Sequence, residues 1–263
     1  MVIHGIKILF FKILENLFKN YVFAMKSGLA RGFKRRYGFG FRPKFLLTED
    51  EEFLIKMDFD GRVVYDVGGY IGIYSMFFSR AVGKDGVVIT FEPNPKNYHE
   101  LFLNLQLNKI SNVITRNVGL GQGREKRSLF FDPTLPGRGT LRANAKKGDH
   151  TKSRREIVEI EIDSLDNIMQ KEKMPYPDFI KIDIEGFEID VLKGMSITLD
   201  RHKPDLFIEI HGVLQEEMIH MLHSSGYSIR HIESNRKNIQ SDESPIRGGH
   251  IYCRIEEHGQ AGE

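Results

Sequence analysis

Asp66-Val67-Gly68-Gly69-Tyr70-Ile71-Gly72 directly follows the apolar run Val63-Val64-Tyr65, and this stretch decides the fold. An apolar run that ends in glycines is typical of a buried parallel strand leading into a tight turn against a ligand. About twenty residues later, at the usual spacing for such sites, Val88-Ile89-Thr90-Phe91-Glu92 puts a carboxylate at the tip of the next predicted strand. A carboxylate there can accept both ribose hydroxyls, so the two stretches predict the cradle of a nucleoside cofactor.

The glycine spacing distinguishes between kinds of cofactor. Dinucleotide sites usually carry G-x-G-x-x-G, whereas here Gly68 and Gly69 are adjacent and Gly72 follows. The acidic Asp66 that opens the loop disfavours a pyrophosphate, because two negative groups would then face each other beside a helix N-terminus. The pattern favours a net cationic ligand such as S-adenosylmethionine.

Composition and charge set the outer bounds. With 263 residues, the chain is expected to form one large domain over residues 61–263 behind a helical and basic extension over residues 1–60. A formal net charge of +2 does not indicate a nucleic-acid partner. Cys253 is the only cysteine, which predicts a reducing, cytoplasmic setting without an intrachain disulfide. The sequence also lacks the run of about eighteen apolar residues that a transmembrane segment needs.

The extension carries two features of its own. Apolar residues recur at helical spacing over residues 6–23 with lysines on the other face, which predicts an amphipathic helix. Docking on the body of the protein is the preferred interpretation, and peripheral membrane contact or an oligomer contact stays open. The basic and aromatic residues 31–42 are interpreted as a solvated loop or as a substrate contact. A short helix is predicted from Thr48, as its cap, through Ile55.

From Gly61 onward, predicted strands and helices alternate, which indicates a doubly wound, mainly parallel sheet. The strands are expected over residues 62–67, 87–91, 113–118, 179–184 and 206–210, and the first two helices over residues 70–82 and 95–108, the latter capped by Asn94. Residues 119–162 break the alternation with two hairpin strands, at 128–131 and 156–162. The polar residues 133–155 between them are predicted to form a mobile lid.

Charged residues gather near the ends of two later strands. Period-two alternation over residues 179–184 puts Lys181, Asp183 and Glu185 on one side at the carboxyl end, where open α/β sheets bind ligands. The next strand ends in Glu209-Ile210-His211, which places Glu209 and His211 on one face for the same reason. A histidine beside several carboxylates at adjacent strand tips is a candidate for proton transfer.

In order, the stretches at residues 66–72, 91–95, 162–166, 180–188 and 208–211 resemble the FkbM family of class I S-adenosylmethionine-dependent methyltransferases. The resemblance covers residues 63–212, and the family usually has Ala-Asn in place of Gly69-Tyr70. It implies a Rossmann-like, seven-stranded sheet whose last strands lie at residues 227–232 and 250–255, the latter antiparallel. It also implies O-methylation of a hydroxyl on a small molecule or glycan, and we prefer a carbohydrate.

The resemblance further implies roles for single residues. The methionine part of the cofactor is expected on Asp66, Gly68, Gly69 and Gly72, the ribose on Glu92, and the adenine near Asn117. His211 is the first candidate for the base that removes the hydroxyl proton, held by Glu209 or Asp183, while Lys181 either orients these carboxylates or lowers the pKa of the acceptor.

Three alternatives stay open. A divalent cation, magnesium or manganese, on Asp183, Glu185, Glu209 and His211 is a competing way to activate the hydroxyl, and metal-free catalysis is preferred. A nicotinamide-dependent oxidoreductase would need the wider glycine spacing and a catalytic Tyr/Lys or Cys/His pair. A non-catalytic Rossmann-like module would be expected to have lost Asp66, Gly68 or Glu92, and all are present.

Overall fold

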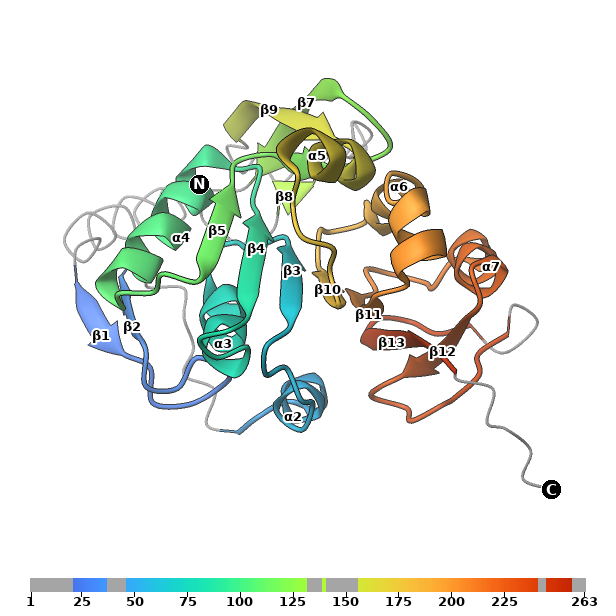
Figure 1. Ribbon diagram of the computed structural model, residues 1–263, viewed down its shortest axis with the longest axis horizontal. Helices are drawn as coiled ribbons and strands as arrows, with labels where there is room; N and C mark the ends of the chain where they lie inside the picture. The colour runs from blue at the N-terminus through green and yellow to red at the C-terminus, as the bar shows by residue number, and fades with distance from the viewer. Residues whose placement is uncertain (1–20, 37–45, 132–138, 141–155, 241–244, 257–263) are drawn as a thin grey trace, which may run out of the picture.

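A seven-stranded sheet forms the centre of the protein, seen in a computed structural model that describes residues 21–36, 46–131, 139–140, 156–240 and 245–256 (Figure 1). The spatial order is β12-β13-β11-β10-β3-β4-β5, and only β13 runs antiparallel to its neighbours. The strands are β3 (Val63–Val67), β4 (Val87–Phe91), β5 (Val113–Arg116), β10 (Phe179–Ile182), β11 (Asp205–Glu209), β12 (Tyr227–His231) and β13 (His250–Ile255). The predicted fold class and the antiparallel last strand are confirmed.

Helices cover both faces of this sheet. They are α2 (Glu49–Ile55), α3 (Ile73–Ala81), α4 (Pro95–Leu107), α5 (Leu165–Glu172), α6 (Glu188–Lys193) and α7 (Glu216–Ser224), with a π-helical turn η1 (Thr198–His202). Asn94 caps α4 as predicted, since its side chain accepts a hydrogen bond from the Lys96 backbone N–H at 3.0 Å. Thr48 precedes α2 as predicted, and its backbone N–H donates to Glu51 Oε2 at 3.1 Å.

Alternation along the strands builds the two cores. Tyr65 and Ile180 face one side, in a buried cluster with residues of α5, α6 and α7. Val64 and Phe179 face the other side, where they pack with residues of α2 and α3. Because β3, β4, β10 and β11 bury both of their faces over most of their length, these central strands read as near-continuous apolar runs. Polar residues on these strands can therefore lie only at the ends or in paired sites.

Four short strands between residues 119 and 163 form a second sheet. Its order is β6-β9-β7-β8, from β6 (Gly119–Leu120), β9 (Glu156–Asp163), β7 (Glu125–Phe131) and β8 (Gly139–Thr140). The two predicted hairpin strands are confirmed, although β7 begins three residues earlier than residue 128 because residues 125–127 also pair with β9. Apart from β8, the predicted lid lies outside the described residues.

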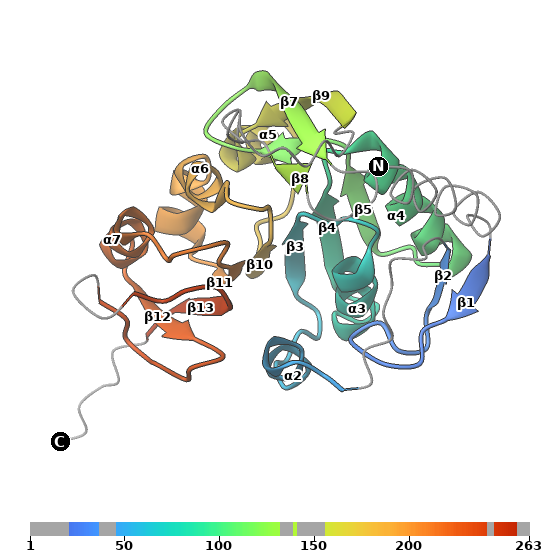
Figure 2. The same ribbon diagram turned by 180° about the vertical axis from the view of Figure 1, so that it is seen from behind.

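The N-terminal segment forms a hairpin rather than the end of a helix. β1 (Val22–Ala24) pairs antiparallel with β2 (Lys34–Arg36), so the helix predicted over residues 6–23 is wrong at its C-terminal end. Residues 6–20 of that helix and residues 37–42 of the basic stretch lie outside the described part of the chain. The hairpin lies beside α4 in both views (Figures 1 and 2). In the ranges that the structure describes, no helix has the length and apolarity to cross a membrane.

Asn104 of α4 joins this hairpin to the glycine loop. Its Oδ1 accepts a hydrogen bond from the Arg36 backbone N–H at 2.8 Å, and its Nδ2 donates to the carbonyl of Ile71 at 2.9 Å. The side chain is fully buried. The hydrogen bond to Ile71 is buried and the one to Arg36 is partly buried, so this side chain connects the extension to the loop.

We expect Asn104→Ala to lower the free energy of unfolding by about 1–3 kcal/mol, because it leaves buried polar groups without partners. Urea unfolding measures this. Gln106→Ala on an exposed position of the same helix is the control, with an expected change within about 0.5 kcal/mol. Equal stability of the two variants would contradict the bridging role of Asn104.

Candidate active site

The glycine loop after β3 approaches its neighbours too closely for side chains. Gly68 has a φ of +86°, and a Cβ there would collide with the carbonyl of Asp183. A Cβ on Gly69 would meet Thr90 and Leu101. Helix α3 begins only at Ile73, not at the predicted Tyr70, because Gly72 at its N-cap has a φ of +93°. The loop therefore keeps bare backbone at the carboxyl end of β3.

Glu92 follows β4 and reaches toward this loop. Its Oε2 accepts a hydrogen bond from the Tyr70 backbone N–H at 2.8 Å, and its Oε1 accepts one from the Asn94 backbone N–H at 2.9 Å. Burial raises the pKa of Glu92 to about 7, although these backbone hydrogen bonds lower it. A buried carboxylate between the strand tip and the loop has the chemistry to bind paired hydroxyls.

Asp66 and Asn117 support the loop and the strand tip. Asp66 is fully buried; its Oδ2 accepts a hydrogen bond from Ser75 Oγ at 2.6 Å, while its Oδ1 has no hydrogen-bond partner among the residues that the structure describes. The Nδ2 of Asn117 donates to the carbonyls of Glu92 and Pro93 at 2.8 and 3.1 Å. Asn117 thereby fixes the turn that carries Glu92, at the edge where the adenine is predicted.

Lys181 is a buried cation on the central strand β10. Its Nζ lies 3.5 Å from Asp66 Oδ1 and 3.1 Å from Asp183 Oδ2, and 4.3 Å from the centre of the Tyr74 ring. Burial lowers the pKa of Lys181, but the charges of Asp183 and Asp66 outweigh this effect and raise it. Lys181 therefore stays charged and links the glycine loop to the next group of residues.

The chain leaves the sheet earlier than predicted. Strand β10 ends at Ile182 rather than at residue 184, and Glu185 has a φ of +55°. The predicted alternation therefore does not extend to Glu185. The turn nevertheless brings Asp183 and Glu185 to the same imidazole, that of His211, which follows β11.

His211 lies among four carboxylates. Its Nδ1 is hydrogen-bonded to Glu188 Oε1 at 2.9 Å, and its Nε2 lies 3.6 Å from Glu209 Oε1, 3.6 Å from Glu185 Oε2 and 3.8 Å from Asp183 Oδ1. Partial burial lowers the pKa of His211, but the hydrogen bond to Glu188 and the surrounding charges outweigh it and raise the pKa to about 9. Sequence reasoning missed Glu188; its place three residues after Glu185, at the start of α6, was the available signal.

Asp183 and Glu209 form an unequal pair. Burial raises the pKa of Asp183, but Lys181 outweighs it and keeps this pKa below its usual range. Burial and the charge of Asp183 raise the pKa of Glu209 to about 7. Ligand atoms of Asp183, Glu209 and His211 lie within 4.8 Å of one another, so this set has the donors to hold a divalent cation. The predicted residues thus come together in one cluster. It contains His211, which holds a proton, and Glu209, which can exchange one.

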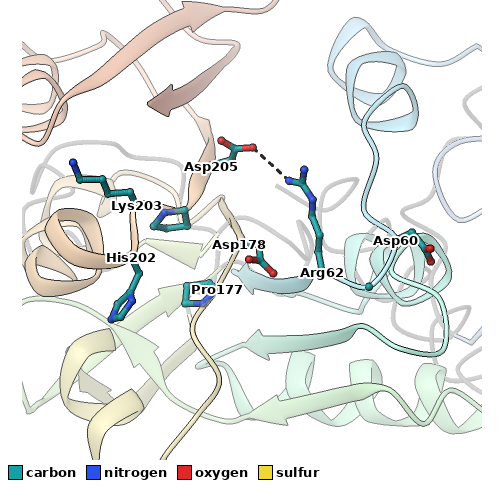
Figure 3. Close-up of a pocket in the computed structure, with 9 residues that line it drawn as sticks. Asp60, Arg62, Pro177, Asp178, His202, Lys203 and Asp205 are labelled. Atoms are coloured by element: carbon teal, nitrogen blue, oxygen red, sulfur yellow. Dashed lines mark hydrogen bonds and ion pairs between the residues drawn. The ribbon is translucent and has the colours of Figure 1, made fainter. Parts of the chain in front are cut away.

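A pocket of about 400 Å³ lies elsewhere, among residues that precede β3, β10 and β11 (Figure 3). The pocket is lined by Arg62, Asp178, His202, Lys203 and Asp205, among others. The guanidinium of Arg62 lies 3.5 Å from the Asp205 carboxylate. These positions are at the amino ends of parallel strands, at the edge opposite to Glu92 and Asp183. The pocket is therefore separate from the candidate active site.

Residues 66–229 match the family described as the methyltransferase FkbM domain. This match covers more than half of the chain, and the chain belongs to the FkbM methyltransferase family. The resemblance drawn from the sequence is thereby confirmed, and a nicotinamide-dependent oxidoreductase finds no support in it.

Two relatives and one solved structure are similar to this chain. The hexuronic acid methyltransferase AglP of Haloferax volcanii is 29% identical over 194 residues, which cover 73% of this chain and 71% of AglP. Methyltransferase 1 of Beauveria bassiana is 28% identical over 52% of this chain, which spans 59% of that protein's length. The FkbM methyltransferase from Methylobacillus flagellatus, known from a crystal structure, is 19% identical to this chain. The match covers 75% of this chain and 45% of that protein's chain, with a TM-score of 0.48.

We expect Gly68→Ala to destabilise the protein by about 1–3 kcal/mol, because the positive φ and the Asp183 carbonyl both oppose a side chain. Chemical unfolding measures the change. Gly123→Ala is the matched control, since no atom lies within 4 Å of a Cβ built there. A Gly68→Ala protein as stable as this control would show that the loop does not require glycine.

Proposed function

We propose that this chain is an S-adenosylmethionine-dependent O-methyltransferase that methylates a hydroxyl of a small molecule or glycan, preferably a carbohydrate. One observation carries the proposal: the glycine loop with Glu92 and the cluster around His211 lie at one edge of the sheet, joined by the buried cation Lys181. The family match supports methyl transfer, and the similarity to a hexuronic acid methyltransferase supports a carbohydrate acceptor. The single cysteine, Cys253, is buried and unpaired, in keeping with our proposal of a cytoplasmic location.

The residues present fit S-adenosylmethionine. Gly68 and Gly69 allow the loop to pack closely against Asp183, Thr90 and Leu101 at the strand tips, and Glu92 offers a carboxylate to the ribose hydroxyls. The loop opens with Asp66 rather than with a basic residue, which suits a sulfonium cofactor better than a pyrophosphate. When bound, this cofactor supplies an electrophilic methyl group, and the protein has to align the acceptor oxygen with it.

The cluster supplies a place for the acceptor's proton. His211 would accept it on Nε2, because Glu188 holds Nδ1. Its pKa of about 9 makes the neutral form a minority near pH 7, and Glu209, with a pKa of about 7, is the second group able to take the proton. The surrounding carboxylates stabilise the imidazolium that forms. Lys181 keeps Asp183 ionised beside this imidazolium.

A bound divalent cation is the second candidate for activating the acceptor. The donor set of Asp183, Glu209 and His211 favours it, since carboxylate and imidazole ligands suit magnesium or manganese. Such an ion would lower the pKa of the hydroxyl without a dedicated base.

Isothermal titration with S-adenosylmethionine, with NAD as a control ligand, tests the cofactor. Because Glu92 has a pKa of about 7 and its ionised form accepts the ribose hydroxyls, we expect the affinity to fall by about tenfold from pH 8 to pH 6. Glu92→Gln should bind more weakly at pH 8 and lose this pH dependence. Folded protein that binds no adenosyl ligand, or binds NAD instead, would overturn the proposal.

Turnover with a panel of hexoses, hexuronic acids and their methyl glycosides tests the acceptor class, with S-adenosylhomocysteine and methylated product followed by mass spectrometry. We expect His211→Asn to lower kcat by at least about 100-fold with unchanged cofactor affinity, because it removes the proton acceptor. An undiminished rate in this variant would refute the role of His211. Loss of wild-type activity in EDTA, with recovery in magnesium or manganese, would support the cation instead.

A further inference from the structure

His250 and Glu233 lie beyond residue 229, where the family match ends, yet they reach the candidate active site. Strand β13 pairs antiparallel with β11, and this register places His250 directly opposite Glu209. Glu233 follows β12, the edge strand that pairs with β13. Neither residue belongs to the motifs that carry the family resemblance.

Glu233 holds the His250 ring in one orientation. Its Oε2 accepts a hydrogen bond from the His250 backbone N–H at 2.8 Å, and its Oε1 binds the ring Nδ1 at 2.7 Å. Partial burial raises the pKa of Glu233, but these hydrogen bonds outweigh it and lower the pKa. The ring also stacks on Phe207, with centroids 5.0 Å apart and planes inclined by 18°. With Nδ1 engaged, only Nε2 is left to face other groups.

Nε2 of His250 faces carboxylates of the candidate site. It lies 3.9 Å from Glu209 Oε2 and 3.9 Å from Asp50 Oδ2. The other oxygen of Glu209, Oε1, lies 3.6 Å from His211 Nε2. Glu209 is therefore flanked by two imidazoles, one on each oxygen. Asp50 also accepts a hydrogen bond from the Tyr74 hydroxyl at 3.3 Å, which joins the same network to the ring over Lys181.

We propose that His250, oriented by Glu233, is a positioning residue that holds the Glu209 carboxylate with Oε1 toward His211. His250 acts through Glu209 and not on the acceptor. The proposal rests on the proposed function, in that Glu209 and His211 handle the acceptor's proton, and it extends the site to the last two strands. The antiparallel strand thus contributes to chemistry as well as to the closure of the sheet.

Two substitutions at His250 separate the contributions of its two ring nitrogens. In His250→Asn, the amide can replace Nδ1 toward Glu233 but nothing replaces Nε2, whereas His250→Gln places an amide near the position of Nε2. The readout is the NMR signal of the His211 imidazole in full-length protein labelled with 13C- and 15N-histidine, assigned by its loss in His211→Asn. We expect this signal to shift in His250→Asn and to return toward the wild-type position in His250→Gln.

Controls keep this result independent of folding and of the acceptor. His202→Asn changes a histidine of the pocket at the opposite sheet edge and should leave the His211 signal in place. If His250→Asn does not fold, Glu233→Gln tests the same support, with the same shift expected. An unchanged His211 signal in a folded His250→Asn or Glu233→Gln variant would overturn the proposal.

Kinetics distinguish this proposal from the proposed function. With an acceptor of the sugar panel, His250→Asn should lower kcat by about 10- to 100-fold, with KM and the Kd for S-adenosylmethionine within about twofold of wild type. A lower affinity for the cofactor at unchanged kcat would contradict positioning. Failure of the wild-type protein to bind S-adenosylmethionine would remove the proposed function, and the NMR comparison would still decide whether His250 orients Glu209.

Discussion

The buried ammonium of Lys181 is the constraint around which the candidate site is built. A lone cation in a sheet core costs several kcal/mol, so strand β10 can carry Lys181 only where carboxylates meet it. The parallel register places Asp66 of β3 directly beside it, and Asp183 follows at the end of its own strand. One cation thus ties the base of the glycine loop to the cluster around His211.

The two halves of the site then differ in their chemistry. At the loop, the backbone of Gly68 and Gly69 packs against Asp183, Thr90 and Leu101, and Glu92 accepts a hydrogen bond from the Tyr70 backbone N–H. At the cluster, burial and neighbouring charges together separate the pKa values: Lys181 keeps Asp183 ionised, while His211 and Glu209 have pKa values of about 9 and 7. In the proposed function, the carboxylate for the ribose hydroxyls and the groups for proton exchange therefore share one edge of the sheet.

Local patterns were sufficient to predict most of the central sheet. The apolar runs at residues 63–67, 87–91 and 205–209 form buried strands because both of their faces are covered, and this pattern is visible without tertiary information. The N-terminal strand β1 was missed because its partner β2 and helix α4 decide its conformation, against its helical spacing. Glu185 left the predicted alternation because β10 ends at Ile182.

The candidate site was predictable only in part, for a similar reason. Lys181, Asp183, Glu209 and His211 lie near the ends of adjacent parallel strands, so their meeting follows from the fold class. Glu233 and His250 reach Glu209 through the pairing of β13 with β11 and β12, which joins residues far apart in the chain. Such pairing leaves no signal in the spacing of nearby residues.

A crystal structure with bound S-adenosylhomocysteine tests the central claim most directly, because it locates both halves of the site relative to one ligand. We expect the ribose hydroxyls within hydrogen-bond distance of Glu92, the amino acid part along Gly68 and Gly69, and the sulfur facing the cluster of Asp183, Glu209 and His211. A ligand bound away from the glycine loop, or one whose sulfur faces away from this cluster, would contradict it.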